Sequence, residues 1–393
     1  MNSQTAVLTP IRRHDIDWLK VLLLYLLFAI QVSRVFDAEM NPDGGSRIFH
    51  NGFSYIGFLS SQWYVPFVFL VSGWSIKNAM QLRPGTTLLR DRLLRLIIPF
   101  TTGFILLVPL TISGGIMGDL LSAVPVHTGP DMVMDAPSFS NAPVIFNRPD
   151  TFAWSYLMFL PYLFVFTVLS WPFFTWLIAR KVTPLKISRA WVYLPVVPLI
   201  LIQMSIRGYW PGEKNLSDNW VMLLYFLAFF ILGFVISRYS AYERAIHQEA
   251  RFAGTLGAVL SVVILTTASN LPGHVFPLLT PIASWCCAVG ILGLAKSYLD
   301  APSSWLIYLL EASLPVFVLH QVSIVVISSA MDGFMIGTSA RFMGLLLLSL
   351  GASIMLYQFI IRRFALMRVF FGLKIEKEPV ESLKDQVFHR DHQ

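Results

Sequence analysis

The chain has 393 residues, enough for two or three soluble domains, but its composition excludes that class. Charged residues make up 13% of the chain and apolar residues 55%. Soluble proteins carry roughly 25% charged residues. A surface this apolar needs lipid to cover it, so the composition predicts an all-α, polytopic membrane protein.

The formal charge of +7 does not indicate nucleic-acid binding. The basic residues fall in short clusters between apolar runs, which is the pattern that sets membrane topology, and they form no basic face. Cys286 and Cys287 are adjacent within an apolar run, a poor geometry for a structural disulfide or a metal site. We therefore expect neither a nucleic-acid partner nor a metal.

Ten apolar runs are long enough to cross a bilayer as helices, which takes roughly 17–25 residues. They cover residues 18–36, 54–76, 93–112, 152–178, 190–206, 219–237, 252–271, 275–295, 303–328 and 342–361. Alternate connecting segments then hold 23 of the 29 Lys and Arg residues, with 6 on the other side. This bias predicts that both termini face the cytoplasm.

The same topology divides the chain into a membrane domain, residues 1–370, and a charged cytoplasmic tail, residues 371–393. The longest segment on the outer side, residues 113–151, is rich in Gly and Pro. A connection of that length is usually either functional or disordered.

Polar residues follow one face of the first run. Lys20 and Gln31 are 11 residues apart, which places them on the same helix face and about 16 Å apart along the axis. A polar stripe of this kind suggests a lined cavity. The alternative is that Lys20 extends to the inner membrane surface while Gln31 hydrogen-bonds a neighbouring helix.

Two further sites carry candidate functional residues. Arg92 and Arg95 share a helix face and could clamp phosphates, although on these residues alone the ordinary flanking charges of a membrane helix are the favoured explanation. His320 lies deep in the ninth run, as a catalytic or substrate-binding residue or as a hydrogen-bonding group between helices. Glu311 lies half a turn out of register with His320, so the two face opposite sides.

Three stretches resemble a known family. They are Asp15-Ile-Asp-Trp-Leu-Lys20-Val21, the run from Trp63 to Trp74 with its Ser72-Gly73 step before Arg92-Leu-Leu-Arg95, and Ser313-Leu-Pro-Val-Phe-Val-Leu-His320-Gln321. Their order resembles membrane-bound acyltransferase family 3, in particular the branch that contains glucan biosynthesis protein C. The resemblance extends from about residue 12 to 362.

The resemblance implies an integral enzyme, an acyltransferase that moves groups other than aminoacyl groups. Such an enzyme takes an acyl group, commonly acetyl, from cytoplasmic acyl-CoA to a hydroxyl of an extracytoplasmic glycan or other acceptor, in the inner membrane of a bacterium. It also implies that Lys20, Arg92 and Arg95 meet the CoA phosphates and that His320 serves catalysis. Lys20 and Gln31 stand where the family pattern has Arg and His.

Gln31 departs from the family pattern in a way that matters, because a carboxamide cannot act as a general base. One interpretation is an active enzyme in which His320 is the base and Gln31 holds the acyl carbonyl. Another is a silent relative with a binding, accessory or transport role, and a third is an engineered replacement of His. A secondary transporter of five plus five helices is disfavoured, because the 18–36 run lacks the Gly or Pro that breaks such helices and the 219–237 run has only Gly233.

Overall fold

The computed structural model describes residues 13–40, 54–82, 87–90, 92, 94–106, 159–180, 187–207, 220–267, 275–331 and 337–373. These residues are helical apart from short turns, and the described part of the chain contains no strand. Six of its helices are long and apolar enough to cross a membrane. The all-α membrane fold is thus confirmed, whereas the 113–151 segment and the tail beyond 373 lie outside the described residues.

The helices follow the predicted runs closely. They are α1 (His14–Met40), α2 (Ser54–Leu82), α5 (Phe159–Ala179), α6 (Val196–Arg207), α7 (Trp220–Arg238), α8 (Ser240–Thr267), α9 (Phe276–Tyr298), α10 (Ser304–Met331), α11 (Thr338–Leu356) and the short α12 (Ala365–Phe370). A further helix is described over residues 94–106, inside the predicted third run. The π-helical turn η3 (Tyr357–Ile361) extends α11 to the end of the tenth run.

Two predicted boundaries are wrong. The run 190–206 is a 3₁₀ turn, η2 (Arg189–Tyr193), followed by α6, because Pro195 interrupts the hydrogen-bonding pattern of a continuous helix. Helix α8 begins 12 residues before the predicted 252, since its charged first turns continue the apolar helix into the polar region. What reads as a charged loop in the sequence is therefore the exposed end of a long helix.

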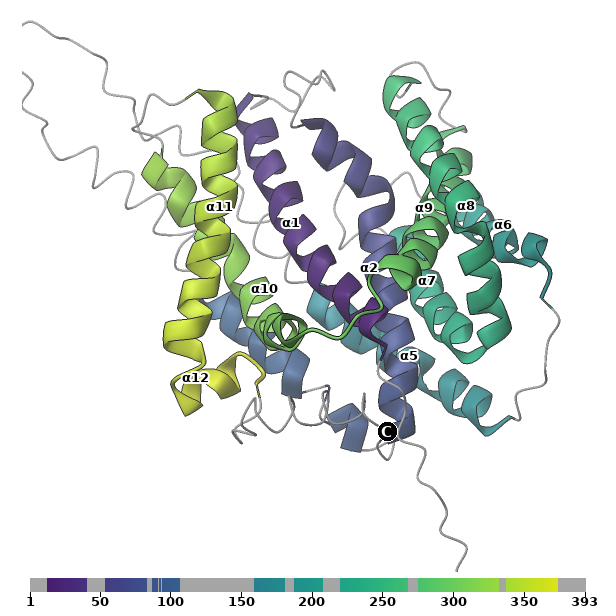
Figure 1. The fold of residues 1–393 in the computed structure, drawn as a ribbon, viewed down its shortest axis with the longest axis horizontal. Helices are drawn as coiled ribbons and strands as arrows, with labels where there is room; N and C mark the ends of the chain where they lie inside the picture. Colours follow the sequence, from purple (N-terminus) through teal and green to yellow (C-terminus); the bar gives the residue numbers. More distant parts are fainter. Residues whose placement is uncertain are drawn as a thin grey trace, which may run out of the picture.

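Helices α1 and α2 form the centre of the bundle (Figure 1). On one side α1 packs against α10 and α11, and a cluster of buried residues that includes Phe28, Val316 and Phe342 fills this interface. On the other side α2 packs against α7 and α9, and α8 packs along α9. Chemistry placed on α1 and α2 is thus enclosed by helices from both halves of the chain.

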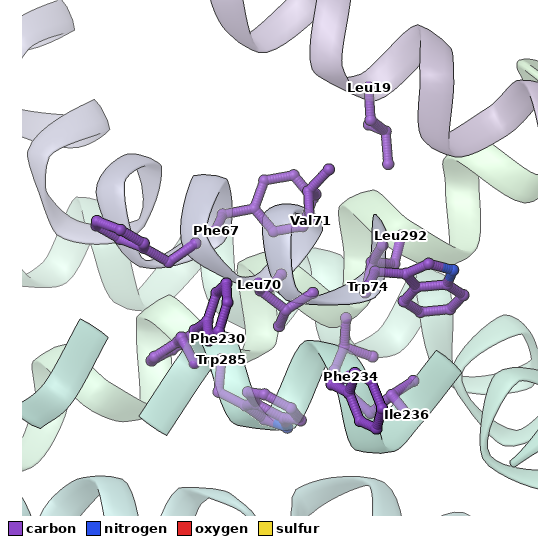
Figure 2. Packing of buried hydrophobic residues seen from close by; sticks show 14 of the residues in the cluster. Leu19, Phe67, Leu70, Val71, Trp74, Phe230, Phe234, Ile236, Trp285 and Leu292 are labelled. Atoms are coloured by element: carbon purple, nitrogen blue, oxygen red, sulfur yellow. The ribbon is translucent and has the colours of Figure 1, made fainter. Parts of the chain in front are cut away.

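Aromatic side chains fill the larger cluster around α2 (Figure 2). The rings of Phe174 and Phe234 stack with centroids 3.8 Å apart, and Phe69 stacks on Phe226 at 5.4 Å. The indole N–H of Trp285, fully buried, donates a hydrogen bond to the carbonyl of Val192 at 2.7 Å. This packing accounts for many of the Phe residues and holds α2 firmly against α7.

Candidate active site

A cavity of about 420 Å³, here called the central cavity, lies between α1, α2, α5, α10 and the helix over 94–106. Most of its wall is aliphatic and aromatic, with Leu23, Leu24, Leu27 and Ile30 contributed by α1 alone. Its polar lining residues are Lys20, Gln31, Arg34, Tyr64, Ser72, Tyr162, Ser313 and His320. A mostly apolar pocket with a few convergent polar groups is typical of small-molecule sites.

Lys20, Gln31 and Arg34 all line this cavity from α1. The polar stripe predicted from helical periodicity therefore faces a cavity. From Lys20 to Arg34 the helix rises about 21 Å, a large part of a hydrocarbon core of about 30 Å. The cavity consequently follows α1 through most of the membrane depth.

His320 enters the cavity from α10 and is 1% exposed. Its ring Nδ1 hydrogen-bonds the carbonyl oxygen of Phe317. A carbonyl can only accept, so Nδ1 carries the proton in the neutral ring and Nε2 keeps its lone pair. Within the described residues Nε2 has no hydrogen-bond partner. A buried basic nitrogen without a partner, in the wall of a cavity, is suited to accept a proton from a bound molecule.

The Gln31 side chain lies in the same wall and is 4% exposed. Its Nε2 has no hydrogen-bond partner among the described residues. Leaving a buried amide donor unsatisfied costs about 1–3 kcal/mol. A ligand carbonyl in the cavity would accept from this N–H and remove that cost.

Further polar groups of the cavity wall are already engaged by the helices. The Tyr64 hydroxyl donates to the carbonyl of Leu23 at 2.9 Å, and the Ser313 hydroxyl donates to that of Leu309 at 2.7 Å. At the end predicted to face the cytoplasm, the ammonium of Lys20 lies 3.0 Å from a carboxylate oxygen of Asp17. Of the polar lining, His320 and Gln31 are the buried pair with an unused atom.

Arg92 and Arg95 are not among the residues that line this wall, and Leu96 lines it from the described part of their helix. Arg92 precedes Leu96 by one turn and so lies on the same helix face. Partial burial and the charge of Arg95 lower the pKa of Arg92 to about 10. Burial first and the charge of Arg95 second disfavour the charged form of Arg92, and an anion close to Arg92 would offset both effects.

Glu311 and His320 diverge as their spacing predicts. Glu311 faces Arg368 of α12, with 3.3 Å between the carboxylate and guanidinium. Periodicity also explains why Arg34, three residues after Gln31, reaches the cavity. By contrast, Tyr162 could not be identified from sequence, because no local pattern distinguishes it from other polar residues in apolar helices.

A family model described as an acyltransferase domain matches residues 13–358. The chain belongs to acyltransferase family 3. The match begins just before α1 and ends in η3, so it includes every described residue that lines the central cavity. No curated protein and no solved structure matches the chain.

Membership of acyltransferase family 3 makes the chain a membrane acyltransferase in general terms. The three sequence stretches that resemble the family supply residues of the same cavity: Lys20 from the first, Tyr64 and Ser72 from the second, and Ser313 and His320 from the third. Among the described residues, no group of three or more His, Cys, Asp or Glu side chains is arranged to hold a metal ion.

Proposed function

We propose that the chain transfers an acyl group, commonly acetyl, from cytoplasmic acyl-CoA to a hydroxyl of an extracytoplasmic glycan or other acceptor. One observation carries the proposal: a single cavity runs along α1 and contains both an unpaired imidazole nitrogen and an unpaired amide donor. The donor enters at the Lys20 end, and the acceptor reaches the Arg34 end. The membrane is the inner membrane of a bacterium, and the branch is that of glucan biosynthesis protein C.

His320 is the general base of the proposed reaction. Its Nε2 accepts the hydroxyl proton of the acceptor while the hydroxyl oxygen attacks the thioester carbonyl carbon. The carbon–sulfur bond then breaks, and the proton passes from Nε2 to the departing CoA thiolate. The Phe317 carbonyl holds Nδ1–H throughout and so keeps Nε2 directed at the cavity.

Gln31 is the donor to the acyl carbonyl oxygen. Negative charge grows on that oxygen as the tetrahedral intermediate forms, and a fixed N–H donor stabilises it. An amide serves this role at any pH because it does not titrate, whereas a histidine at the same position would have to be protonated on the donating nitrogen.

Lys20, Arg92 and Arg95 bind the CoA phosphates in this proposal. Lys20 opens the cavity on the inner side and meets a phosphate as a compact charge, while the arginine pair offers planar, bidentate donors. The lowered pKa of Arg92 supports the assignment, because a phosphate beside it would compensate for its burial and for the repulsion from Arg95.

The test is transfer of labelled acetyl from acetyl-CoA to a glycan by the purified chain, compared with His320→Ala and with Gln321→Ala. Gln321, the neighbour on α10, is equally buried but does not line the cavity. Loss of transfer in His320→Ala alone is expected. Retained transfer in His320→Ala would make His320 structural.

A second candidate is a catalytically silent family member that binds donor or acceptor without transfer. The observation in its favour is Gln31, at the position where the family pattern has His. The two candidates separate in one measurement, since the silent protein binds CoA but releases no thiol from acetyl-CoA in the presence of glycan. If Gln31→His then gained transfer, the silent interpretation would hold.

A further inference from the structure

A cluster of polar and aromatic side chains lies where α11 ends, at the end of the bundle predicted to face the cytoplasm. Here α11 passes into the π-helical turn η3, in which the N–H of Arg362 donates to the carbonyl of Tyr357, five residues earlier, at 2.9 Å. Short π-helical turns are rare and often mark functional sites. The cluster, here called the η3 cluster, consists of Tyr308, Gln358, Phe359, Arg362 and Arg363, and none of its members lines the central cavity.

Arg362 is held in a fixed position within the η3 cluster. Its guanidinium donates to Oε1 of Gln358 at 3.3 Å and lies over the ring of Tyr308, 5.7 Å from the ring centroid. The Tyr308 hydroxyl donates to the same oxygen of Gln358 at 3.1 Å. The planar donors of Arg362 are therefore oriented before any ligand arrives, which lowers the entropic cost of binding one.

The positive charge of the η3 cluster is not balanced by the acid next to it. Glu311, one turn after Tyr308 on α10, pairs with Arg368 of α12 at 3.3 Å. Arg363 is exposed and lies over the ring of Phe359, 5.5 Å from its centroid. In the described part of the chain, neither Arg362 nor Arg363 forms an ion pair. Consecutive guanidiniums without a carboxylate partner favour an anion with several oxygens, such as a phosphate.

Exposed apolar side chains surround the two arginines. Phe359 precedes them on η3, Phe364 follows them, and Leu366 lies on α12. Trp305, at the start of α10, is 69% exposed and packs edge-on against Tyr308 with ring centroids 6.4 Å apart. Tryptophan is enriched where the membrane meets water. The surface thus sets guanidiniums beside apolar side chains, the arrangement that fits a headgroup and the first part of its acyl chains.

We propose that the η3 cluster binds an anionic phospholipid of the cytoplasmic leaflet. Arg362 and Arg363 donate to the phosphate oxygens, and the acyl chains lie against Phe359 and Phe364. Basic pockets between membrane helices on the cytoplasmic side have the chemistry that such headgroups require. This site is independent of the acyl-transfer chemistry, because it uses other residues on another side of α10.

The η3 cluster is joined through α12 to a wall of the central cavity. The hydroxyl of Thr102, on the helix over 94–106, donates to the carbonyl of Phe370 at 3.0 Å. Gly372, with a φ of +72°, passes so close to that helix that a Cβ would lie 3.1 Å from the carbonyl oxygen of Arg95. Leu96 of the same helix lines the central cavity. A lipid that fixes η3 and α12 therefore also supports this wall.

Positive-inside flanking accounts for arginines at the inner end of a helix. It does not account for a guanidinium held by Gln358 and Tyr308 on a π-helical turn. The two explanations differ in a measurable way. Flanking charge predicts that any two arginines at this membrane surface contribute equally to binding of anionic lipid, whereas a site predicts that Arg362 and Arg363 contribute more.

The test compares the purified full-length chain with Arg362→Gln/Arg363→Gln. The matched control is Arg244→Gln/Arg251→Gln, which removes two exposed arginines from the first half of α8. Binding of phosphatidylglycerol and of phosphatidylcholine to the detergent-solubilised proteins is titrated by native mass spectrometry, with coenzyme A as a competitor. Thermal unfolding is measured in bilayer discs of phosphatidylcholine, with and without phosphatidylglycerol.

The Arg362→Gln/Arg363→Gln variant should bind phosphatidylglycerol roughly tenfold or more weakly than the parent, since each basic residue at an anionic surface contributes a factor of about five. Phosphatidylglycerol should raise its unfolding temperature less than that of the parent, and the control should behave like the parent.

Three results would overturn the inference. The first is unchanged phosphatidylglycerol binding in the Arg362→Gln/Arg363→Gln variant, or an equal loss in the control. The second is displacement of the lipid by coenzyme A. The third needs no variant to fold, because it is equal binding of phosphatidylglycerol and phosphatidylcholine by the parent itself.

Discussion

Gly73 of α2 lies directly against the backbone carbonyl of Phe230 on α7. A Cβ at position 73 would overlap that carbonyl oxygen, and the crossing is reciprocal, because a Cβ at Gly233 would overlap the carbonyl of Leu70. The two backbones approach this closely only because both positions are glycine. The crossing fixes α2, which carries one wall of the central cavity.

Gly73→Ala should therefore destabilise the fold. Overpacking of this kind costs about 1–3 kcal/mol, and here the obstructing atom is backbone, which cannot rotate away. The measurement is denaturant or thermal unfolding in detergent. Gly351→Ala in α11 is the matched control, since nothing lies within 4 Å of a Cβ there. Equal stability of the two variants would contradict the close crossing.

The ion pair between Arg13 and Asp15 should contribute measurably to the stability of the fold. Asp15 is 1% exposed and depends on Arg13 for its charge partner. Arg13→Gln should destabilise the chain by up to about 3–5 kcal/mol, because a buried carboxylate loses the guanidinium that donates two hydrogen bonds to it. Arg13→Gln/Asp15→Asn should recover much of that loss. Arg189→Gln is the control. It removes the ion pair between the exposed Arg189 and Glu249, whose charged atoms are 3.9 Å apart, and should change the free energy of unfolding by less than about 1 kcal/mol.

The all-helical fold, the positions of most described helices and the polar face of α1 could be predicted from the sequence, because all three follow from local hydropathy and periodicity. Lys20 and Gln31 line one cavity because 11 residues of an α-helix complete close to three full turns, which brings both side chains to the same face. The break at Pro195 and the early start of α8 also have local causes in the sequence. The apolar run across Pro195 and the charged residues before position 252 give stronger signals, so both predicted boundaries are wrong.

The partners of α1 could not be predicted. His320 and Gln31 line one cavity while Arg92 and Arg95 lie outside its wall, and this depends on how α10 and the helix over 94–106 pack against α1. The contact between the starts of α1 and α8 is still less visible in the sequence. Arg13 and Glu243 are 230 residues apart, and their charges read as separate topology signals until the fold joins them.

The topology itself remains a prediction with a direct measurement. With 23 basic residues on one side and 6 on the other, reporter fusions at Asp135 and after Phe371 should report opposite compartments. Fusions at these two sites avoid the residues that line the central cavity. The same compartment at both sites would rule out ten crossings.

Gln31→Ala should lower kcat with little change in the KM for acetyl-CoA. The amide acts on charge that appears only in the transition state, and removing one such donor costs on the order of a hundredfold in kcat. Gln31→Glu tests whether the effect is electrostatic. A carboxylate of the same size repels the developing oxyanion, so kcat of this variant should be at least as low as that of Gln31→Ala. A raised KM with unchanged kcat would instead make Gln31 a ground-state binding residue.

Leu27→Trp should block the central cavity without unfolding the chain. Leu27 lines the cavity between Lys20 and Gln31, so an indole there occupies the path that joins the donor end to the acyl-transfer groups. Transfer should fall on the order of a hundredfold, since misplacing the reacting groups by about 1 Å has an effect of that size. The matched control is Leu22→Trp on the same helix, where the side chain is 45% exposed and does not line the cavity. Unfolding in detergent checks that both variants are equally stable. Equal transfer by the two variants would place the acyl group elsewhere, because position 27 faces the proposed path and position 22 does not.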